Sequence, residues 1–300
     1  MHGGMAFTTS FAVQLRVTPH FHTSSLSRKR YQPRTRVSER MTATAPLRTD
    51  SEPEETKASY APVLILPGLG NASADYEELC QKLIDRGHKA VSTVPIRRWQ
   101  WGQNAKGFLK KNYWNATLTP ELVLDWYFKR VDRAVSELLE QNDGGAINVI
   151  GHSAGGWLGR AYIAERAPEG LQVSTLLTLG TPNRGPPEGT IDQTRGLLRY
   201  VEERCDVSQL VSDLVCVAGT GTVGKGFGKG GSVSELIAYY SYAAVCGKGD
   251  VDGDGVTPVD AACAENGTLV LCDDCDHSML TSKKWYGSDS TLAKWATYLR

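Results

Sequence analysis

The stretch Ile147-Asn148-Val149-Ile150-Gly151-His152-Ser153-Ala154-Gly155-Gly156 decides the interpretation of this 300-residue chain. It begins as a short apolar run typical of a buried strand, and a helix is predicted directly after it, over residues 156–167. A serine between glycines at such a turn is typical of a nucleophile elbow, where side chains at 151 or 155 would collide with neighbouring backbone. The pattern also occurs by chance in ordinary turns, but the strand and the helix around it favour Ser153 as a catalytic nucleophile.

A serine hydroxyl is a poor nucleophile until a base accepts its proton. The base is therefore expected to be a histidine later in the chain, with an acid between the two. His277 is the only histidine after Ser153 and directly follows the last predicted strand, so we predict it to be the base. Three candidate acids, Asp250, Asp252 and Asp254, share one loop after the strand predicted at 214–218. The acid would orient the imidazole and stabilise its protonated form.

A second requirement of acyl transfer is a pair of donors for the oxyanion. The segment Leu66-Pro67-Gly68-Leu69-Gly70-Asn71 follows the first predicted strand. We predict that the backbone N–H of Leu69 and that of Ala154 form this pair. An ordinary glycine turn is the alternative for the first of these loops.

The whole chain alternates apolar runs with longer periodic stretches. Strands are predicted at 63–66, 89–94, 147–150, 176–179, 214–218 and 269–271, and helices at 76–86, 120–140, 156–167 and 292–299. Continuous apolar strands between helices predict an α/β fold with a doubly wound, mostly parallel sheet. Two stretches, 97–118 and 186–213, do not fit the alternation and are predicted to be loops or lid-like insertions.

The first 50 residues differ from the remainder in charge, with eight Lys and Arg against two acids. Residues 1–48 are also rich in Ser, Thr and His without a long apolar stretch, which is typical of an organelle transit peptide. A plastid is the first expectation and a mitochondrion the second, and a disordered basic tail of a cytosolic protein is the alternative. Residues 49–59 lack large apolar side chains and are predicted to be a linker. The folded domain is expected over residues 60–300.

Composition indicates which kinds of binding partner and cellular environment to expect. Beyond residue 50 the chain carries 25 basic and 31 acidic residues, which disfavours a nucleic-acid surface. No run approaches the roughly 18 apolar residues that cross a bilayer, so a soluble protein or one with peripheral membrane contact is expected. Seven cysteines at irregular spacings predict mostly reduced thiols. The oligomeric state is left open.

Three apparent cofactor or metal motifs lack a required residue. Residues 219–226 resemble a phosphate loop, but Gly226 stands where a hydroxyl is needed. The calcium-like spacing that starts at Asp250 has Ala261 at its twelfth position, where a glutamate is needed. Cys272 and Cys275 lack further zinc ligands at matched spacing. We therefore predict no cofactor and no metal. Because the two cysteines adjoin His277, redox control of activity is a hypothesis.

Several segments carry a family resemblance. The segment Leu179-Gly180-Thr181-Pro182-Asn183-Arg184-Gly185 resembles the Gly-Thr-Pro-His-x-Gly segment of lipases, with Asn183 in place of the histidine. Together with the serine turn, it makes residues 61–300 similar to the lipase-related branch of the α/β-hydrolases, which includes the GPI inositol-deacylase-like lipases. Likeness to plant and algal plastid members rests on residues 98–101, 124–127, 239–258 and 285–287. The Gly-Asp-Gly-Val-x-Pro turn at 253–258 resembles the acid turn of lipases, which implies Asp254 as the acid and Asp252 as the alternative.

We therefore predict a serine carboxylic ester hydrolase, a lipase or esterase that acts on lipid-like esters through an acyl-enzyme. An acyltransferase with the same triad, a chlorophyllase-type pigment esterase and a non-catalytic binding protein are the alternatives. Aromatic and basic side chains between residues 97 and 118 would suit a lid at a lipid surface, although ordinary packing explains them equally well. They are Trp99, Trp101, Phe108, Tyr113 and Trp114, with Lys106, Lys110 and Lys111.

Overall fold

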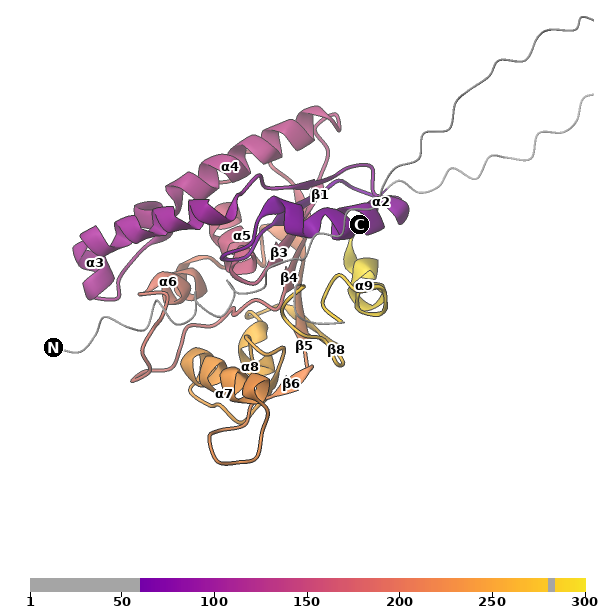
Figure 1. The fold of residues 1–300 in the computed structure, drawn as a ribbon. Coiled ribbons are helices and arrows are strands. Elements are labelled where there is room, and N and C mark those ends of the chain that lie inside the picture. The colour runs from indigo at the N-terminus through magenta and orange to yellow at the C-terminus, as the bar shows by residue number, and fades with distance from the viewer. Residues whose placement is uncertain (1–59, 280–283) are drawn as a thin grey trace, which may run out of the picture. The chain divides into compact units, whose positions relative to one another are not determined.

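The computed structural model describes residues 60–279 and 284–300, so the predicted transit peptide and linker lie outside the described residues. At its centre is a parallel sheet in the order β2-β1-β3-β4-β5-β8 (Figure 1). The strands are β1 (Val63–Leu66), β2 (Val91–Thr93), β3 (Ile147–His152), β4 (Val173–Leu179), β5 (Val211–Gly219) and β8 (Thr268–Cys272). The chain moves outward from β1 in one direction to β2 and in the other through β3. Loops that leave β1 and β3 therefore diverge at a topological switch point, where open parallel sheets form their sites.

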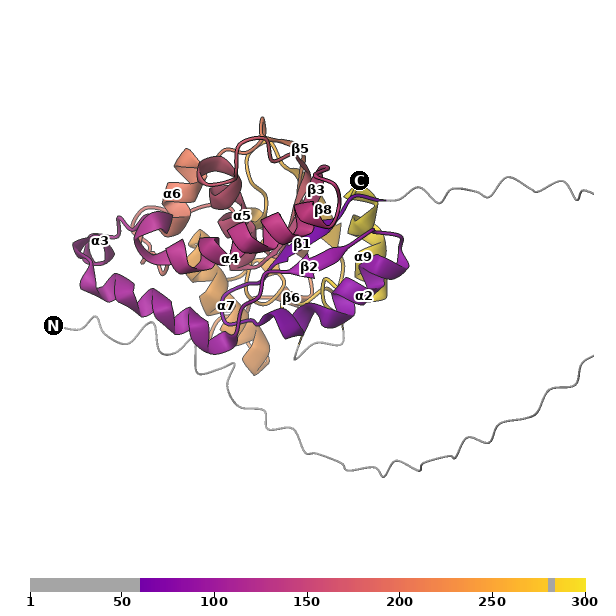
Figure 2. The same cartoon turned by 90° about the horizontal axis from the view of Figure 1, so that it is seen from above.

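Helices cover both faces of the sheet, which confirms the predicted doubly wound layout (Figures 1 and 2). Leu64 and Leu66 of β1 pack in one buried cluster, while Val63 and Ile65 pack in the other, as the two-residue repeat of a strand requires. The first cluster is closed by α4 (Pro120–Glu140), α5 (Ala154–Glu165) and α6 (Leu197–Arg204). The second is closed by α2 (Glu77–Asp85) and α9 (Asp289–Trp295). Short 3₁₀ turns precede α2 and follow α9, at η1 (Ser73–Tyr76) and η3 (Ala296–Tyr298).

Of the two predicted loops or lid-like insertions, residues 186–213 contain the helix α6, and residues 97–118 are helical over most of their length. This stretch forms a 3₁₀ helix, η2 (Arg98–Leu109), followed by the short helix α3 (Lys111–Trp114). A 3₁₀ helix repeats every three residues, so the apolar spacing does not match the 3.6-residue period of an α-helix. Trp101, Asn104 and Gly107 follow this three-residue repeat. Of these, Trp101 and Gly107 are buried, and the Asn104 side chain accepts a hydrogen bond from the indole of Trp126 on α4 (2.8 Å).

A small subdomain between β5 and β8 was not predicted. It contains α7 (Val233–Cys246), α8 (Val259–Ala262) and a hairpin of β6 (Thr222–Val223) with β7 (Asp252–Gly253). Helix α7 packs on the loop of the candidate acids, where the hydroxyl of Tyr242 accepts the N–H of Gly255 (2.6 Å). Among the described residues, no helix is long and apolar enough to cross a membrane.

Candidate active site

Ser153 lies at the sharp turn between β3 and α5, with φ 53° and ψ −126°. A non-glycine residue rarely adopts a positive φ, and the fold must hold it there. Glycines occupy the positions around Ser153 where a side chain would not fit. A Cβ atom at Gly151 would overlap the backbone of Gly156, and one at Gly155 would overlap the carbonyl oxygen of Leu66. The turn therefore has the strained geometry that the serine and glycine pattern predicts.

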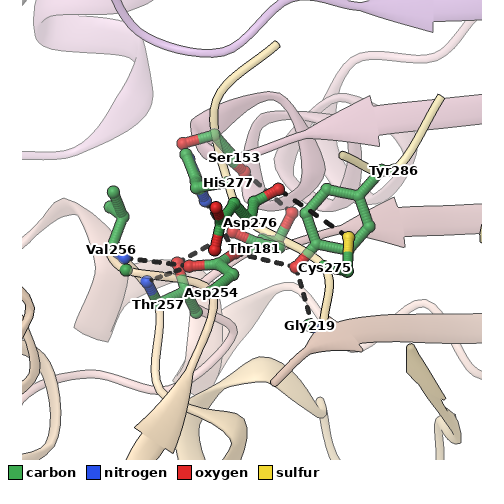
Figure 3. A network of polar contacts seen from close by, with 12 residues as sticks. Ser153, Thr181, Gly219, Asp254, Val256, Thr257, Cys275, Asp276, His277 and Tyr286 are labelled. Carbon is green, nitrogen blue, oxygen red and sulfur yellow. Dashed lines mark hydrogen bonds and ion pairs between the residues drawn. The ribbon is translucent and has the colours of Figure 1, made fainter. Parts of the chain in front are cut away.

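His277 and Asp254 lie next to this turn, although 23 residues separate them in the chain. Nδ1 of His277 lies 2.7 Å from Oδ2 of Asp254, and the His277 N–H donates to the Asp254 carbonyl oxygen (2.8 Å). The His277 carbonyl oxygen accepts from the ring of His152, the residue before Ser153 (3.1 Å). Figure 3 shows Ser153, His277 and Asp254 following one another in that order. The structure thus brings the three predicted residues together.

Asp254 is the buried acid of the cluster, whereas Asp252 is exposed on β7. Oδ1 of Asp254 accepts hydrogen bonds from the N–H groups of Val256 (2.9 Å) and Thr257 (2.7 Å). Oδ2 of Asp254 accepts one from the hydroxyl of Tyr286 (2.7 Å). Burial alone would raise the pKa of Asp254, but His277 and these donors outweigh burial and hold the pKa below its usual value. Asp254 is therefore a carboxylate at neutral pH, and it fixes Nδ1 of His277 as the protonated ring nitrogen.

The loop after β1 lies against the serine turn. A Cβ atom at Gly68 would lie only 2.7 Å from Cβ of Ser153. The next N–H along the loop belongs to Leu69, and α5 starts with the N–H of Ala154. Within the part of the chain that the structure describes, neither of these two groups donates a hydrogen bond. Two free backbone donors near a nucleophile are what an oxyanion site requires.

His152 connects this loop to His277. Its Nε2 donates to the carbonyl oxygen of His277, so Nδ1 is the acceptor for the hydroxyl of Tyr76 (2.9 Å) and for the Asn71 amide (3.3 Å). The same Tyr76 oxygen accepts the N–H of Gly68 (3.2 Å). Burial and the nearby His277 lower the pKa of His152 to about 3, so the ring is neutral. The buried imidazole of His152 therefore links the loop after β1 with His277.

Asn183, at the position where the resembling lipase segment has a histidine, contacts α5 and α8. It is buried, and its side-chain amide donates to the carbonyl oxygen of Ala262 (2.8 Å). Its carbonyl oxygen accepts from the buried guanidinium of Arg160 (3.0 Å). In the same segment, the Thr181 hydroxyl donates to the Ser153 carbonyl oxygen (2.8 Å). These contacts give Asn183 a structural role.

Among the described residues, no group of three or more His, Cys, Asp or Glu side chains is placed to hold a metal ion. The three Asp residues of the calcium-like loop do not converge, because Asp254 turns into the core while Asp250 and Asp252 are exposed. Cys272 and Cys275 are buried free thiols. Burial raises the pKa of Cys272 to about 11 and also raises that of Cys275, so both are protonated and of low reactivity at neutral pH.

Sequence reasoning missed three residues of this cluster: Tyr76, His152 and Tyr286. Each comes from a separate segment, and none has a local pattern that indicates a hydrogen bond to a distant partner. The Trp285-Tyr286-Gly287 segment was noted for its resemblance alone. His152 is a polar side chain at the end of a fully buried strand, which indicates that it needs a buried partner but not which residue that partner is.

The parallel sheet, its switch point and a strained serine beside a His–Asp pair together define the α/β-hydrolase fold. A family model described as palmitoyl protein thioesterase matches residues 62–215, about half of the chain. The chain belongs to this family. No curated protein matches it.

Solved structures to which the chain is similar include the lin2722 gene product of Listeria innocua, with 13% identity and a TM-score of 0.47 over 79% of this chain and 92% of that one. A monoacylglycerol lipase of Paleococcus ferrophilus has 11% identity and a TM-score of 0.41, over 77% and 91%. An esterase domain from Rhodothermus marinus has 15% identity and a TM-score of 0.37, over 80% and 85%.

Proposed function

We propose that this hydrolase cleaves acyl esters or thioesters through an acyl-enzyme on Ser153. Nε2 of His277, the ring nitrogen that Asp254 does not engage, accepts the Ser153 proton while Oγ attacks the acyl carbonyl. The N–H groups of Leu69 and Ala154 bind the resulting oxyanion, and the protonated His277 then donates to the leaving alcohol or thiol. Water repeats the sequence, releases the carboxylic acid and restores the serine. The observation that carries this proposal is the Nδ1–Oδ2 contact of 2.7 Å beside a strained serine.

The proposed substrate is a lipid-like acyl chain. Three large apolar residues of α7, namely Val233, Ile237 and Tyr240, are exposed and recur at spacings of four and three, so they share one helix face. This helix also contacts the acid loop, since the Ser241 hydroxyl donates to the carbonyl oxygen of Val256 (2.7 Å). Leu69 and Val256, one beside the proposed oxyanion donors and one beside the acid, are exposed too. Apolar side chains around the site favour an acyl chain over a polar substrate, and the thioesterase family adds thioesters to the predicted carboxylic esters.

Labelling with a fluorophosphonate tests the reaction. The wild-type protein and a Ser136→Ala control should label, and Ser153→Ala should not. An intact wild-type protein that does not label would overturn the proposal. Hydrolysis of p-nitrophenyl esters and acyl-coenzyme A thioesters of graded chain length then measures preference, and we expect kcat/KM to rise with chain length. Added alcohol acceptors distinguish hydrolysis from acyl transfer.

We also propose that the full chain is directed to a plastid by residues 1–48, on the basis of their charge and composition. A fluorescent fusion at the C-terminus of the full chain should co-localise with a plastid marker. A matched fusion that starts at residue 49 should lose that location. Mitochondrial location of the full chain, or equal location of both fusions, would contradict the proposal.

A further inference from the structure

The helical segment at residues 97–119 concentrates exposed apolar side chains at one place. Leu109, Trp99, Trp114 and Phe108 are 87%, 70%, 67% and 40% exposed. Large apolar residues at this exposure are disfavoured on a free surface when they lie together. The predicted lid aromatics therefore divide into two groups, because Trp101 and Tyr113 pack in the core while the other three face outward.

The geometry of η2 aligns the side chains of Trp99 and Phe108 along one face of the helix. In a 3₁₀ helix, residues three apart eclipse one another, so Trp99, Gly102, Ala105 and Phe108 form one column. All four are exposed. Because only glycine and alanine stand between Trp99 and Phe108, the two rings project beyond the rest of the column.

At the end of η2 the apolar surface continues onto α3. The rings of Phe108 and Tyr113 lie 4.6 Å apart between centroids, and those of Tyr113 and Trp114 lie 5.3 Å apart. The indole of Trp114 donates to the carbonyl oxygen of Phe108 (3.1 Å). This bond fixes the exposed indole against the helix end. The surface formed by Trp99, Phe108, Leu109 and Trp114 is hereafter the aromatic surface.

All charged side chains of the same segment are basic. Residues 97–119 contain five Lys and Arg and no Asp or Glu, in a body that has an excess of acids. Arg98 is paired with Asp75 (2.6 Å). Arg97, Lys106, Lys110 and Lys111 are exposed, and no ion pair is formed by any of them among residues 60–279 and 284–300. Four exposed cations without an ion pair among the described residues thus lie in the same segment as the aromatic surface.

The aromatic surface is also linked to the proposed oxyanion loop. The indole of Trp101, on the inner face of η2, donates to the carbonyl oxygen of Asn71 (2.8 Å), two residues after Leu69. The hydroxyl of Tyr127 on α4 donates to Pro67 in the same loop (3.1 Å), and its ring packs on Trp101. The start of η2 is therefore braced directly against the site.

We propose that the aromatic surface and its four cations bind the face of an anionic lipid bilayer. Exposed Trp, Phe and Leu side chains insert at the boundary between headgroups and acyl chains, and Lys and Arg attract the negative headgroups. A protein partner fits less well, since unpaired lysines need a dense negative surface opposite them. The inference adds a partner to the proposed function, because a bilayer at η2 brings acyl substrates to the site, but bilayer binding itself requires no catalysis.

Sedimentation of the full chain with vesicles tests this proposal. All variants carry Ser153→Ala, so the result is independent of the proposed reaction. Binding should be strong to an equimolar mixture of phosphatidylcholine and phosphatidylglycerol and weak to phosphatidylcholine alone. Replacing Lys106, Lys110 and Lys111 with glutamine should weaken binding on the order of a hundredfold, since each basic residue contributes roughly fivefold.

A second variant, Trp99→Ser with Leu109→Ser, should also lose binding to the mixed vesicles and lose the blue shift of Trp fluorescence on addition of vesicles. Its matched control is Phe227→Ser with Ile191→Ser, which removes exposed apolar residues elsewhere and should bind as the parent does. Binding that persists in both η2–α3 variants would come from another segment and would overturn the proposal. Loss in the lysine variant alone would indicate a general polyanion site and would also overturn it.

Discussion

The hydroxyl of Tyr286 donates a 2.7 Å hydrogen bond to Oδ2 of Asp254, the oxygen that also contacts Nδ1 of His277. The same hydroxyl accepts the N–H of Gly219 at the end of β5 (2.9 Å). Tyr286 therefore joins the proposed acid to the central sheet, and it positions the carboxylate without reaching the substrate.

Tyr286→Phe should lower both stability and activity. The change leaves the buried N–H of Gly219 unpaired, which costs about 1–3 kcal/mol in the free energy of unfolding. It also removes a donor from Asp254, so kcat should fall more than KM rises. The control Tyr200→Phe removes a tyrosine–carboxylate bond to Glu165 at the surface and should change stability little. Chemical denaturation and ester hydrolysis measure both effects, and equal stability of the two variants would contradict the role of Tyr286.

Asp254→Asn should reduce kcat roughly ten thousandfold if Asp254 orients His277, as loss of the acid does in other serine hydrolases. Asp252→Asn should retain wild-type kinetics, because Asp252 is exposed on β7. The two residues were the alternatives left by the sequence. Hydrolysis of a short-chain p-nitrophenyl ester measures both variants, and a larger loss in Asp252→Asn would reverse the assignment.

Ser153→Gly should be inactive yet more stable than Ser153→Ala. The positive φ of 53° at this position costs a non-glycine residue of order 1–3 kcal/mol. Glycine relieves that strain but loses about 0.5–1 kcal/mol more backbone entropy on folding. We expect a net difference of about 1 kcal/mol between the two variants in denaturant unfolding. Identical unfolding curves would show that the turn is not strained.

The free energy of unfolding should decrease as the pH is lowered below 6.5, because of His152. Burial and His277 lower its pKa to about 3 in the folded protein, against 6.5 as the ordinary value. Between these values the unfolded chain binds one more proton than the folded one. The free energy of unfolding therefore drops by about 1.4 kcal/mol per pH unit as pH falls from 6.5 toward 3. In His152→Gln this contribution to the slope disappears, and an unchanged slope would contradict it. Asp254 adds a loss only below its usual value of 3.8.

Much of the fold could be predicted because the strands at the centre of the sheet, β1, β3, β4 and β5, are mostly buried. β1 and α4 have the predicted bounds, and the other central strands extend the predicted ones by one to three residues at an end. By contrast, α7 was missed because its apolar residues occupy the whole circumference, which removes the 3.6-residue contrast between faces. Its only local signal is the capping box of Ser232 with Glu235 and the left-handed Gly247 at its end.

The candidate site was predictable where order along the chain limited the choice. His277 had no competitor after Ser153. The choice between Asp252 and Asp254 needed coordinates or a family resemblance, since two residues in one loop differ only in the direction of their side chains. The supporting hydrogen bonds of His152 and Tyr286 join residues 125 and 32 positions from their partners. No local pattern predicts such contacts.

The glycines of the elbow have a consequence for how this enzyme scaffold evolves. The Gly68 backbone approaches Cβ of Ser153 and the carbonyl oxygen of His152, and the Gly155 backbone approaches the carbonyl oxygen of Leu66. The spacing between Ser153 and the loop after β1 is thus set mainly by the backbone, which leaves few side chains whose substitution could change it. We expect changes in substrate preference to arise at exposed side chains such as those of α7 and η2, away from these close contacts.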